Sequence, residues 1–182
     1  MSWACNGGYV RIVILIPSAD FRDETVSKSK LILEKWGVEA IISSYTSGSC
    51  SGIHGAVYTP RLHASKLNSL DYEGILLADG TGIETLKMYD YRPLLDTVRL
   101  FSLNSRLVAA VGNAMKILAR ANIILNVSVA RPPDDDTERL VRLFKGRISD
   151  SAIESQGNIM TLGDSAKIEE FAKAMLDRLG VT

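Results

Sequence analysis

The chain alternates short apolar runs with longer amphipathic segments from one end to the other. Three runs are almost uniformly apolar, which is typical of central strands in a parallel sheet that is buried on both faces. They are residues 9–16, 74–78 and 107–111. Shorter patterns predict further strands at 38–44, 123–129 and 158–161, and a brief hairpin strand at 56–59.

Amphipathic segments with helical spacing lie between these runs. The predicted helices cover residues 20–36, 93–104, 113–122 and 134–144. A further predicted helix lies near the C-terminus. This C-terminal helix has the clearest pattern, because Ile168, Phe171 and Met175 share one face. Asp164 is placed to cap its first turn and Gly180 to end it.

This alternation of strands and helices predicts the fold class. It indicates a single three-layer α/β/α sandwich with a mainly parallel sheet, the arrangement called flavodoxin-like. A length of 182 residues suits one domain with its own core. We therefore expect residues 1–8 to form an N-terminal extension and residues 9–182 to form one domain.

Composition narrows the class of protein. The 21 basic and 21 acidic residues balance, so no concentrated basic surface is expected for nucleic acid. The longest apolar run is far shorter than the roughly 20 residues of a membrane span. No secretory signal is evident at the N-terminus, and the two cysteines, Cys5 and Cys50, are expected to be free thiols. We expect a cytoplasmic protein with no membrane partner.

Nothing in the sequence predicts a metal or another cofactor. Two histidines, His54 and His63, leave little for a zinc or iron site. Asp134, Asp135 and Asp136 precede a predicted helix, where acidic side chains offset the helix dipole, and this explains them better than metal ligation.

Candidate chemistry lies in the loops that follow the strands, because ligands of open α/β sheets bind at the carboxyl edge. The relevant segments are 17–24, the Ser/Gly-rich loop after Ser44, 79–82 and 112–115. The last is a sharp strand–turn–helix connection, the geometry of a nucleophile elbow. Gly112 stands at the turn, where glycine tolerates positive φ at almost no cost.

Four segments, in order and at matching spacing, resemble the ThiJ/PfpI superfamily of class I glutamine amidotransferase-like proteins. They are VILI with DFRD (13–16 and 20–23), DYEGILLADG (71–80), AVGNAM (110–115) and GNIMT (157–161). The resemblance implies an intracellular cysteine peptidase, or an enzyme of the deglycase or glyoxalase type. It also implies a homo-oligomer, either a dimer or a hexamer.

The same alignment predicts that the catalytic groups are missing. The family's nucleophilic cysteine falls on Gly112, and the histidine after it falls on Asn113. The family's glutamate falls on Arg22, or on Asp23 or Glu24 if the register slips. The Pro-Gly-Gly that helps to stabilise an oxyanion in the family corresponds to Ala78, Asp79 and Gly80.

The favoured hypothesis is thus a non-catalytic relative whose elbow pocket binds a small anionic or carbonyl compound. The residues expected to form the pocket are Arg22, Asp79, Gly80, Gly112, Asn113 and Ala114. Arg22 in place of an acid is expected to favour an anion. The alternative is a divergent peptidase, deglycase or glyoxalase-type enzyme that uses Cys50, with His54 nearby, or Asp79.

Overall fold

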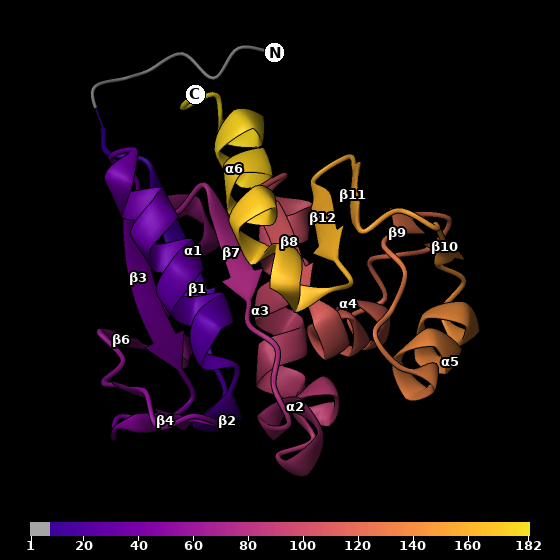
Figure 1. Cartoon of the computed structure of the whole chain (residues 1–182), viewed down its shortest axis with the longest axis horizontal. Coiled ribbons are helices and arrows are strands. Elements are labelled where there is room, and N and C mark those ends of the chain that lie inside the picture. Colours follow the sequence, from indigo (N-terminus) through magenta and orange to yellow (C-terminus); the bar gives the residue numbers. More distant parts are fainter. Residues whose placement is uncertain (1–7) are drawn as a thin grey trace.

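The computed structural model describes residues 8–182, and its centre is a seven-stranded sheet (Figure 1). The strand order is β11-β12-β8-β7-β1-β3-β6. The bounds are β1 Arg11–Leu15, β3 Glu39–Ser44, β6 Leu62–His63, β7 Gly74–Leu77, β8 Leu107–Val111, β11 Ile153–Gln156 and β12 Ile159–Leu162. Every neighbouring pair is parallel except β11 with β12. The predicted mainly parallel sheet is confirmed.

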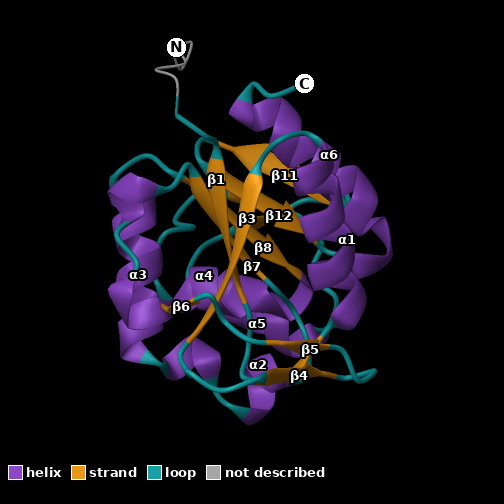
Figure 2. Ribbon diagram, turned by 90° about the vertical axis from the view of Figure 1, so that its left-hand side faces the viewer, coloured by secondary structure: helices purple, strands orange, loops and turns teal. Residues whose placement is uncertain are grey.

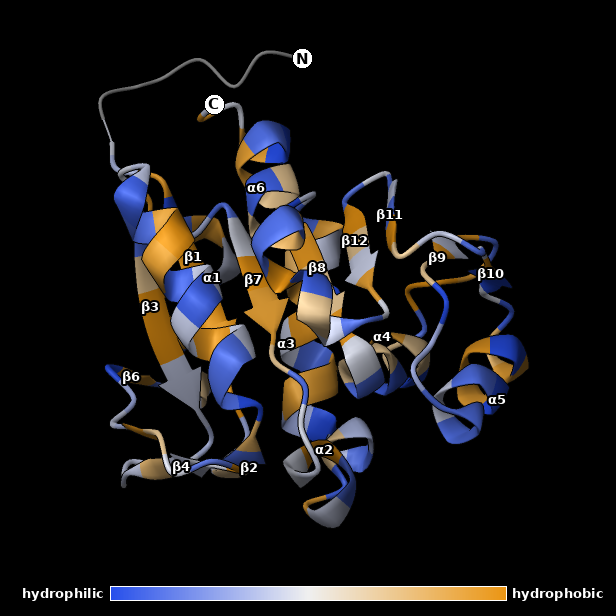
Figure 3. Ribbon diagram, viewed as in Figure 1, coloured by the Kyte–Doolittle hydropathy of each residue, from blue (hydrophilic) through white to orange (hydrophobic). Residues whose placement is uncertain are grey.

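Helices cover both faces of this sheet (Figure 2). On one side lie α1 (Asp23–Lys35) and α6 (Ile168–Leu179). On the other lie α3 (Arg92–Leu103), α4 (Met115–Arg120) and α5 (Asp135–Leu143). Figure 3 shows apolar strands in the middle layer and hydrophilic stretches along the helices. The chain therefore folds as the three-layer sandwich that the alternation predicts.

Two hydrophobic cores result, one on each side of the sheet. Side chains of a strand point alternately to its two faces. In β1, Val13 and Leu15 enter the core under α3 and α4, whereas Ile12 and Ile14 enter the core under α1 and α6. All four are buried, which explains why this strand is apolar at nearly every position.

Short elements surround the carboxyl edge of the sheet. β2 (Ala19–Phe21), β4 (Cys50–Gly52) and β5 (Val57–Tyr58) form a small three-stranded sheet, in which β5 is the hairpin strand expected at 56–59. The brief α2 (Gly82–Thr85) follows β7. These loops lie below the tips of the central strands in Figure 1, on the side where the sequence places the site.

Two predicted elements differ from the structure. Most of the strand expected at 123–129 is a packed loop, because Asn122 and Asn126 adopt positive φ and bend the chain. Ile124 and Val129 still reach the core, whereas Leu125 is exposed. Only β9 (Ser128–Val129) is extended, and it pairs with β10 (Arg147–Ile148) outside the central sheet. The first helix begins at Asp23 rather than residue 20, because 19–21 form β2.

Cys5 and the expected extension at 1–8 lie outside the described residues, apart from Gly8. Among the helices of residues 8–182, none has both the length and the apolar character that crossing a bilayer requires.

The α3 face provides a test of the packing described above. Phe101 is fully buried against the sheet, whereas Leu103 on the same helix is 78% exposed. We expect Phe101→Ala to lower the free energy of unfolding by about 3–5 kcal/mol, because it leaves a cavity in the core. Leu103→Ala is the matched control and should change it by no more than about 0.5 kcal/mol. Urea unfolding of both variants measures the difference, and equal losses would contradict this packing.

Candidate functional site

The turn between β8 and α4 has the geometry expected of an elbow. Gly112 directly follows β8, and its φ is +55°. Gly112–Ala114 form one 3-10 turn that leads into α4. A residue with a side chain would be strained in this conformation, whereas glycine is not. The turn is therefore the sharp connection that the sequence predicts, and no side chain projects from its apex.

The carboxylate of Asp79 fills the space beside that apex. Asp79 lies just beyond the end of β7, the strand next to β8. A Cβ added to Gly112 would lie 3.0 Å from Asp79 Oδ2 and 3.2 Å from Asp79 Cβ. Both separations are shorter than favourable carbon contacts of about 3.5–4.0 Å. A side chain at position 112 would thus compete with Asp79 for the same space.

Two side chains from the start of α1 hold this carboxylate. Arg22 Nε donates to Asp79 Oδ2 at 2.9 Å, and Thr25 Oγ1 donates to Oδ1 at 2.6 Å. The backbone N–H of Arg22 also donates to the carbonyl oxygen of Asp79 at 2.8 Å. The Asp79 side chain is only 5% exposed, whereas that of Arg22 is 44% exposed. Both oxygens of the buried carboxylate therefore have partners.

Thr25 is a site residue that the sequence analysis missed. It is fully buried on the inward face of α1, together with Val26 and Ser29. The only local signal for Thr25 is its position in the first turn of an amphipathic helix. That signal does not identify Asp79, 54 positions away, as its partner. Only the packing of α1 against the end of β7 makes that pairing visible.

Burial raises the pKa of Asp79 above its ordinary value. Desolvation disfavours the charged form, and the hydrogen bond from Thr25 and the charge of Arg22 offset this only in part. The Asp79 carboxyl therefore keeps its proton to a higher pH in the folded chain than in the unfolded chain.

The structure also distinguishes the three residues that compete for the family's glutamate position. The Arg22 side chain bonds to Asp79, which lies beside the elbow. Asp23 turns to the neighbouring loop, where it accepts the backbone N–H groups of His54 at 3.0 Å and Ala56 at 2.8 Å. Glu24 lies on the rim of the cavity described below. Arg22 is accordingly the residue whose side chain faces the elbow interior.

Asn113 and Gly80 bond to one another. The Gly80 N–H donates to Asn113 Oδ1 at 3.2 Å, and Asn113 Nδ2 donates to the Gly80 carbonyl at 2.8 Å. Gly80 has a φ of +144°, and a Cβ there would lie 2.2 Å from the carbonyl oxygen of Asp20. Gly80 is one of the residues expected to form the pocket, but its backbone N–H already donates to Asn113.

A cavity of about 710 Å³ opens above the elbow. We call it the elbow cavity; it lies between the elbow, the start of α1 and the loops that flank β11 and β12. Its lining residues are Arg22, Glu24, Asp79, Gly80, Thr81, Gly112, Asn113, Arg131, Pro132, Pro133, Asp134, Asp150, Ser151, Ala152, Gly163, Asp164, Ser165 and Ala166. Five of the six residues expected to form a pocket are therefore together. The sixth, Ala114, is buried in the core instead.

Acidic side chains dominate the rim of the elbow cavity. Arg22 is paired with Asp79, and Arg131 is the other basic residue in the lining. Four carboxylates remain: Glu24, Asp134, Asp150 and Asp164. Arg22 shares its charge with Asp79, and the four rim carboxylates outnumber Arg131, so the lining as a whole does not favour an anion.

Two of these rim carboxylates are helix caps. Asp134 accepts the N–H of Thr137 at 2.7 Å, and Asp164 accepts that of Ala166 at 2.9 Å. Asp164 thus caps the 3-10 turn Ser165–Lys167 that leads into α6, rather than α6 itself as predicted, because the N-cap of α6 is Lys167. Within residues 8–182, no three potential His, Cys, Asp or Glu ligands meet as they would around a metal ion.

Cys50 and His54 lie apart from this site. Cys50 is fully buried in β4, its Sγ is 3.9 Å from the carbonyl oxygen of Gly48, and burial raises the pKa of its thiol. His54 is exposed. Neither residue lines the elbow cavity. An inert buried thiol fits Cys50 better than an activated nucleophile.

A parallel sheet with an elbow after a central strand defines a class of α/β proteins whose sites lie at that turn. Within this class the family can be named. Residues 10–178 match the profile of the DJ-1/PfpI family, so the chain belongs to that family. The resemblance carried by the four sequence segments is confirmed.

Similar proteins agree with this assignment. An uncharacterized protein of Methanocaldococcus jannaschii is 24% identical over 163 residues, which cover 90% of this chain and 77% of that protein. The ThiJ/PfpI domain protein of Brachyspira murdochii has a TM-score of 0.89 at 26% identity, covering 96% of this chain and 99% of that one. Drosophila melanogaster DJ-1beta has a TM-score of 0.80 at 16% identity, covering 95% and 92% respectively, and shows the fold alone.

The contact between position 112 and Asp79 can be tested by a double-mutant cycle. Gly112→Ala should cost about 1–3 kcal/mol of stability because of its positive φ and the crowding by Asp79. In an Asp79→Ala background the crowding is gone, so the same change should cost less, with a coupling of at least about 0.5 kcal/mol. Chemical unfolding of the four proteins measures the coupling, and strict additivity would contradict the contact.

The raised pKa of Asp79 predicts a pH dependence. The folded chain holds the Asp79 proton at pH values where the unfolded chain has released it, so this group's contribution to stability falls as pH rises from about the ordinary value of 3.8 through the raised pKa. The stability of the wild type relative to Asp79→Asn should therefore decrease over that range. Urea unfolding at a series of pH values measures it. A stability difference that stays constant over that range would contradict the prediction.

Proposed function

We propose that this DJ-1/PfpI family member performs no cysteine-dependent catalysis and instead binds a small molecule in the elbow cavity. The observation that carries the proposal is the Asp79 carboxylate, which occupies the space beside Gly112 where a side chain at the elbow would extend. The turn and the cavity remain, but the described elbow residues supply neither a thiol nor an imidazole. An intact cavity without a nucleophile suits binding better than acyl or carbonyl transfer.

The charges of the lining favour a neutral ligand with carbonyl or hydroxyl groups. The rim carboxylates repel anions, and the positive charge of Arg22 is shared with Asp79. Arg131 can still donate to a carbonyl oxygen, and Ser151 and Ser165 can donate or accept hydrogen bonds. The sequence led us to expect either a small anion or a small carbonyl compound. We propose the carbonyl compound and not the anion.

The second candidate function is general acid–base catalysis by Asp79. Burial raises its pKa, and perturbed carboxyls on cavity walls are common in active sites. Against this, the Asp79 side chain is only 5% exposed, and both of its oxygens accept hydrogen bonds from Arg22 and Thr25, so little of the carboxylate faces the cavity. Cys50 has no comparable observation in its favour.

Turnover assays separate the two functions. Wild-type protein should convert neither methylglyoxal nor a fluorogenic peptide, and Asp79→Asn should behave identically. Turnover by the wild type that Asp79→Asn abolishes would establish the second candidate function. Turnover that survives Asp79→Asn but is lost in Cys50→Ala would assign catalysis to the buried thiol.

Binding is tested by thermal shift with dihydroxyacetone and glycolamide as neutral carbonyl probes. We expect at least one of them to raise the melting temperature. Ala152→Phe places a ring in the cavity lining and should abolish the shift, whereas Ser155→Phe lies outside the lining and should preserve it. No shift with either probe, or a shift that Ala152→Phe leaves intact, would contradict binding of carbonyl compounds in the elbow cavity.

Assembly and location remain predictions from the sequence. We propose a homo-oligomer, a dimer or a hexamer, in the cytoplasm. Light scattering coupled to size exclusion measures the mass directly, and a monomer at micromolar concentration would contradict the proposed assembly.

A further inference from the structure

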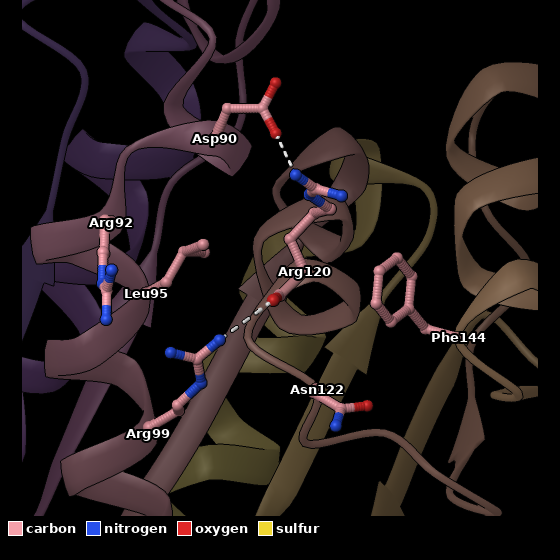
Figure 4. A pocket seen from close by; sticks show the side chains of 7 residues that line it. All are labelled: Asp90, Arg92, Leu95, Arg99, Arg120, Asn122 and Phe144. Carbon is pink, nitrogen blue, oxygen red and sulfur yellow. Dashed lines mark hydrogen bonds and ion pairs between the residues drawn. The ribbon is translucent and has the colours of Figure 1, made fainter.

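A second cavity, of about 560 Å³, lies in the layer formed by α3, α4 and α5 (Figure 4). It is bounded by α3, the C-terminal end of α4 and Phe144, the residue after α5. Its lining shares no residue with the elbow cavity. The volume falls within the roughly 300–1,000 Å³ of small-molecule sites. We call it the arginine cavity.

We propose that the arginine cavity binds a small organic anion, with a carboxylate or phosphate group on an apolar, preferably aromatic body. Three arginines line it, Arg92, Arg99 and Arg120, against one carboxylate, Asp90. Asp96 lies beside the lining and pairs with Arg99, so three arginines face two carboxylates, and the cavity keeps an excess of one positive charge. The proposal is independent of the function assigned to the elbow cavity.

Arg99 forms a fixed wall of the cavity. Its Nε donates to the Ala121 carbonyl at 2.8 Å, and one terminal nitrogen donates to the Arg120 carbonyl at 3.3 Å. The other terminal nitrogen bonds to Asp96 at 2.9 Å. These carbonyls are at the C-terminal end of α4, where cations are favoured. Arg99 is therefore held in place by the fold, and its charge is largely used there.

Arg120 is held in an orientation that leaves donors for a ligand. It bonds to Asp90 at 2.6 Å, and its guanidinium carbon lies 5.8 Å from the centre of the Phe144 ring. A guanidinium carries five N–H donors in a rigid fork, so one ion pair does not exhaust it. Because both contacts already fix the side chain, little conformational entropy is lost when an anion binds.

Arg92 supplies the most available charge. Its side chain is 88% exposed, and its contact with Asp96 measures 3.9 Å, beyond the length of a hydrogen bond. Figure 4 shows Arg92 on the same helix as Arg99, with Leu95 lying between it and Arg120. The Arg120 guanidinium is therefore the group that an anion would contact directly, and Arg92 adds positive charge at the edge of the lining.

Apolar walls complete the site and favour an organic rather than an inorganic anion. Leu95 is buried and Phe144 is half-buried, and both line the cavity. Apolar ligand surface packed on such side chains adds stabilisation that a free phosphate ion does not gain. Phenyl phosphate and benzoate carry both features and serve as probes.

Isothermal titration at low ionic strength tests the proposal on the full chain. We expect saturable binding of phenyl phosphate or benzoate, weaker binding of inorganic phosphate, and none of benzyl alcohol. Arg92→Gln should weaken binding about tenfold, and Arg120→Gln at least as much. Arg139→Gln is the control for overall charge, since Arg139 is 79% exposed on α5 and does not line the cavity.

Each outcome decides the proposal. Absence of saturable binding by both anions overturns it, as does binding that Arg92→Gln and Arg120→Gln leave unchanged, or binding that Arg139→Gln weakens equally. Arg92→Gln tests the site without loss of folding, because this exposed side chain makes no close contact. Binding of the anions that persists in Ala152→Phe distinguishes this cavity from the elbow cavity.

Discussion

The buried Asp79 carboxylate and its two partners hold the site together. Removing a charged carboxylate from water is costly unless its oxygens are bonded, and here Arg22 and Thr25 bond to both of them. The start of α1 is thereby tied to the loop after β7, two segments more than 50 positions apart in sequence. Both segments contribute residues to the lining of the elbow cavity, so its shape depends on this contact.

The Asp79 carboxylate also explains why glycine suits position 112. A side chain at the elbow would be strained by the positive φ and would crowd Asp79 Oδ2. Glycine removes both difficulties. Asn113 then bonds to both polar backbone groups of Gly80, which fixes the adjoining loop. The elbow is thus a well-packed turn whose neighbouring polar groups bond to one another.

Charge is distributed unevenly between the two cavities, although the chain as a whole is formally neutral. Carboxylates surround the elbow cavity, in part because Asp134 and Asp164 cap helices that begin at its rim. Arginines surround the other cavity, in part because Arg99 bonds to the C-terminal carbonyls of α4. Helix ends therefore help to set the opposite character of the two sites.

The sequence by itself determined the layer architecture, the central strands and the position of the elbow. These depend on local periodicity and on where glycine is tolerated, which a single chain shows directly. The same local rules placed a strand at 123–129, because apolar residues in a packed loop have the same pattern as a strand.

Only the tertiary structure decided what the candidate residues do. It paired Arg22 and Thr25 with Asp79, joined Asn113 to Gly80, and moved Ala114 and Cys50 into the cores. It also brought Arg92 and Arg120 from different helices to one cavity. The reason is physical: the role of a charge or a donor depends on which groups folding brings within hydrogen-bond distance, and spacing along the chain does not contain that information.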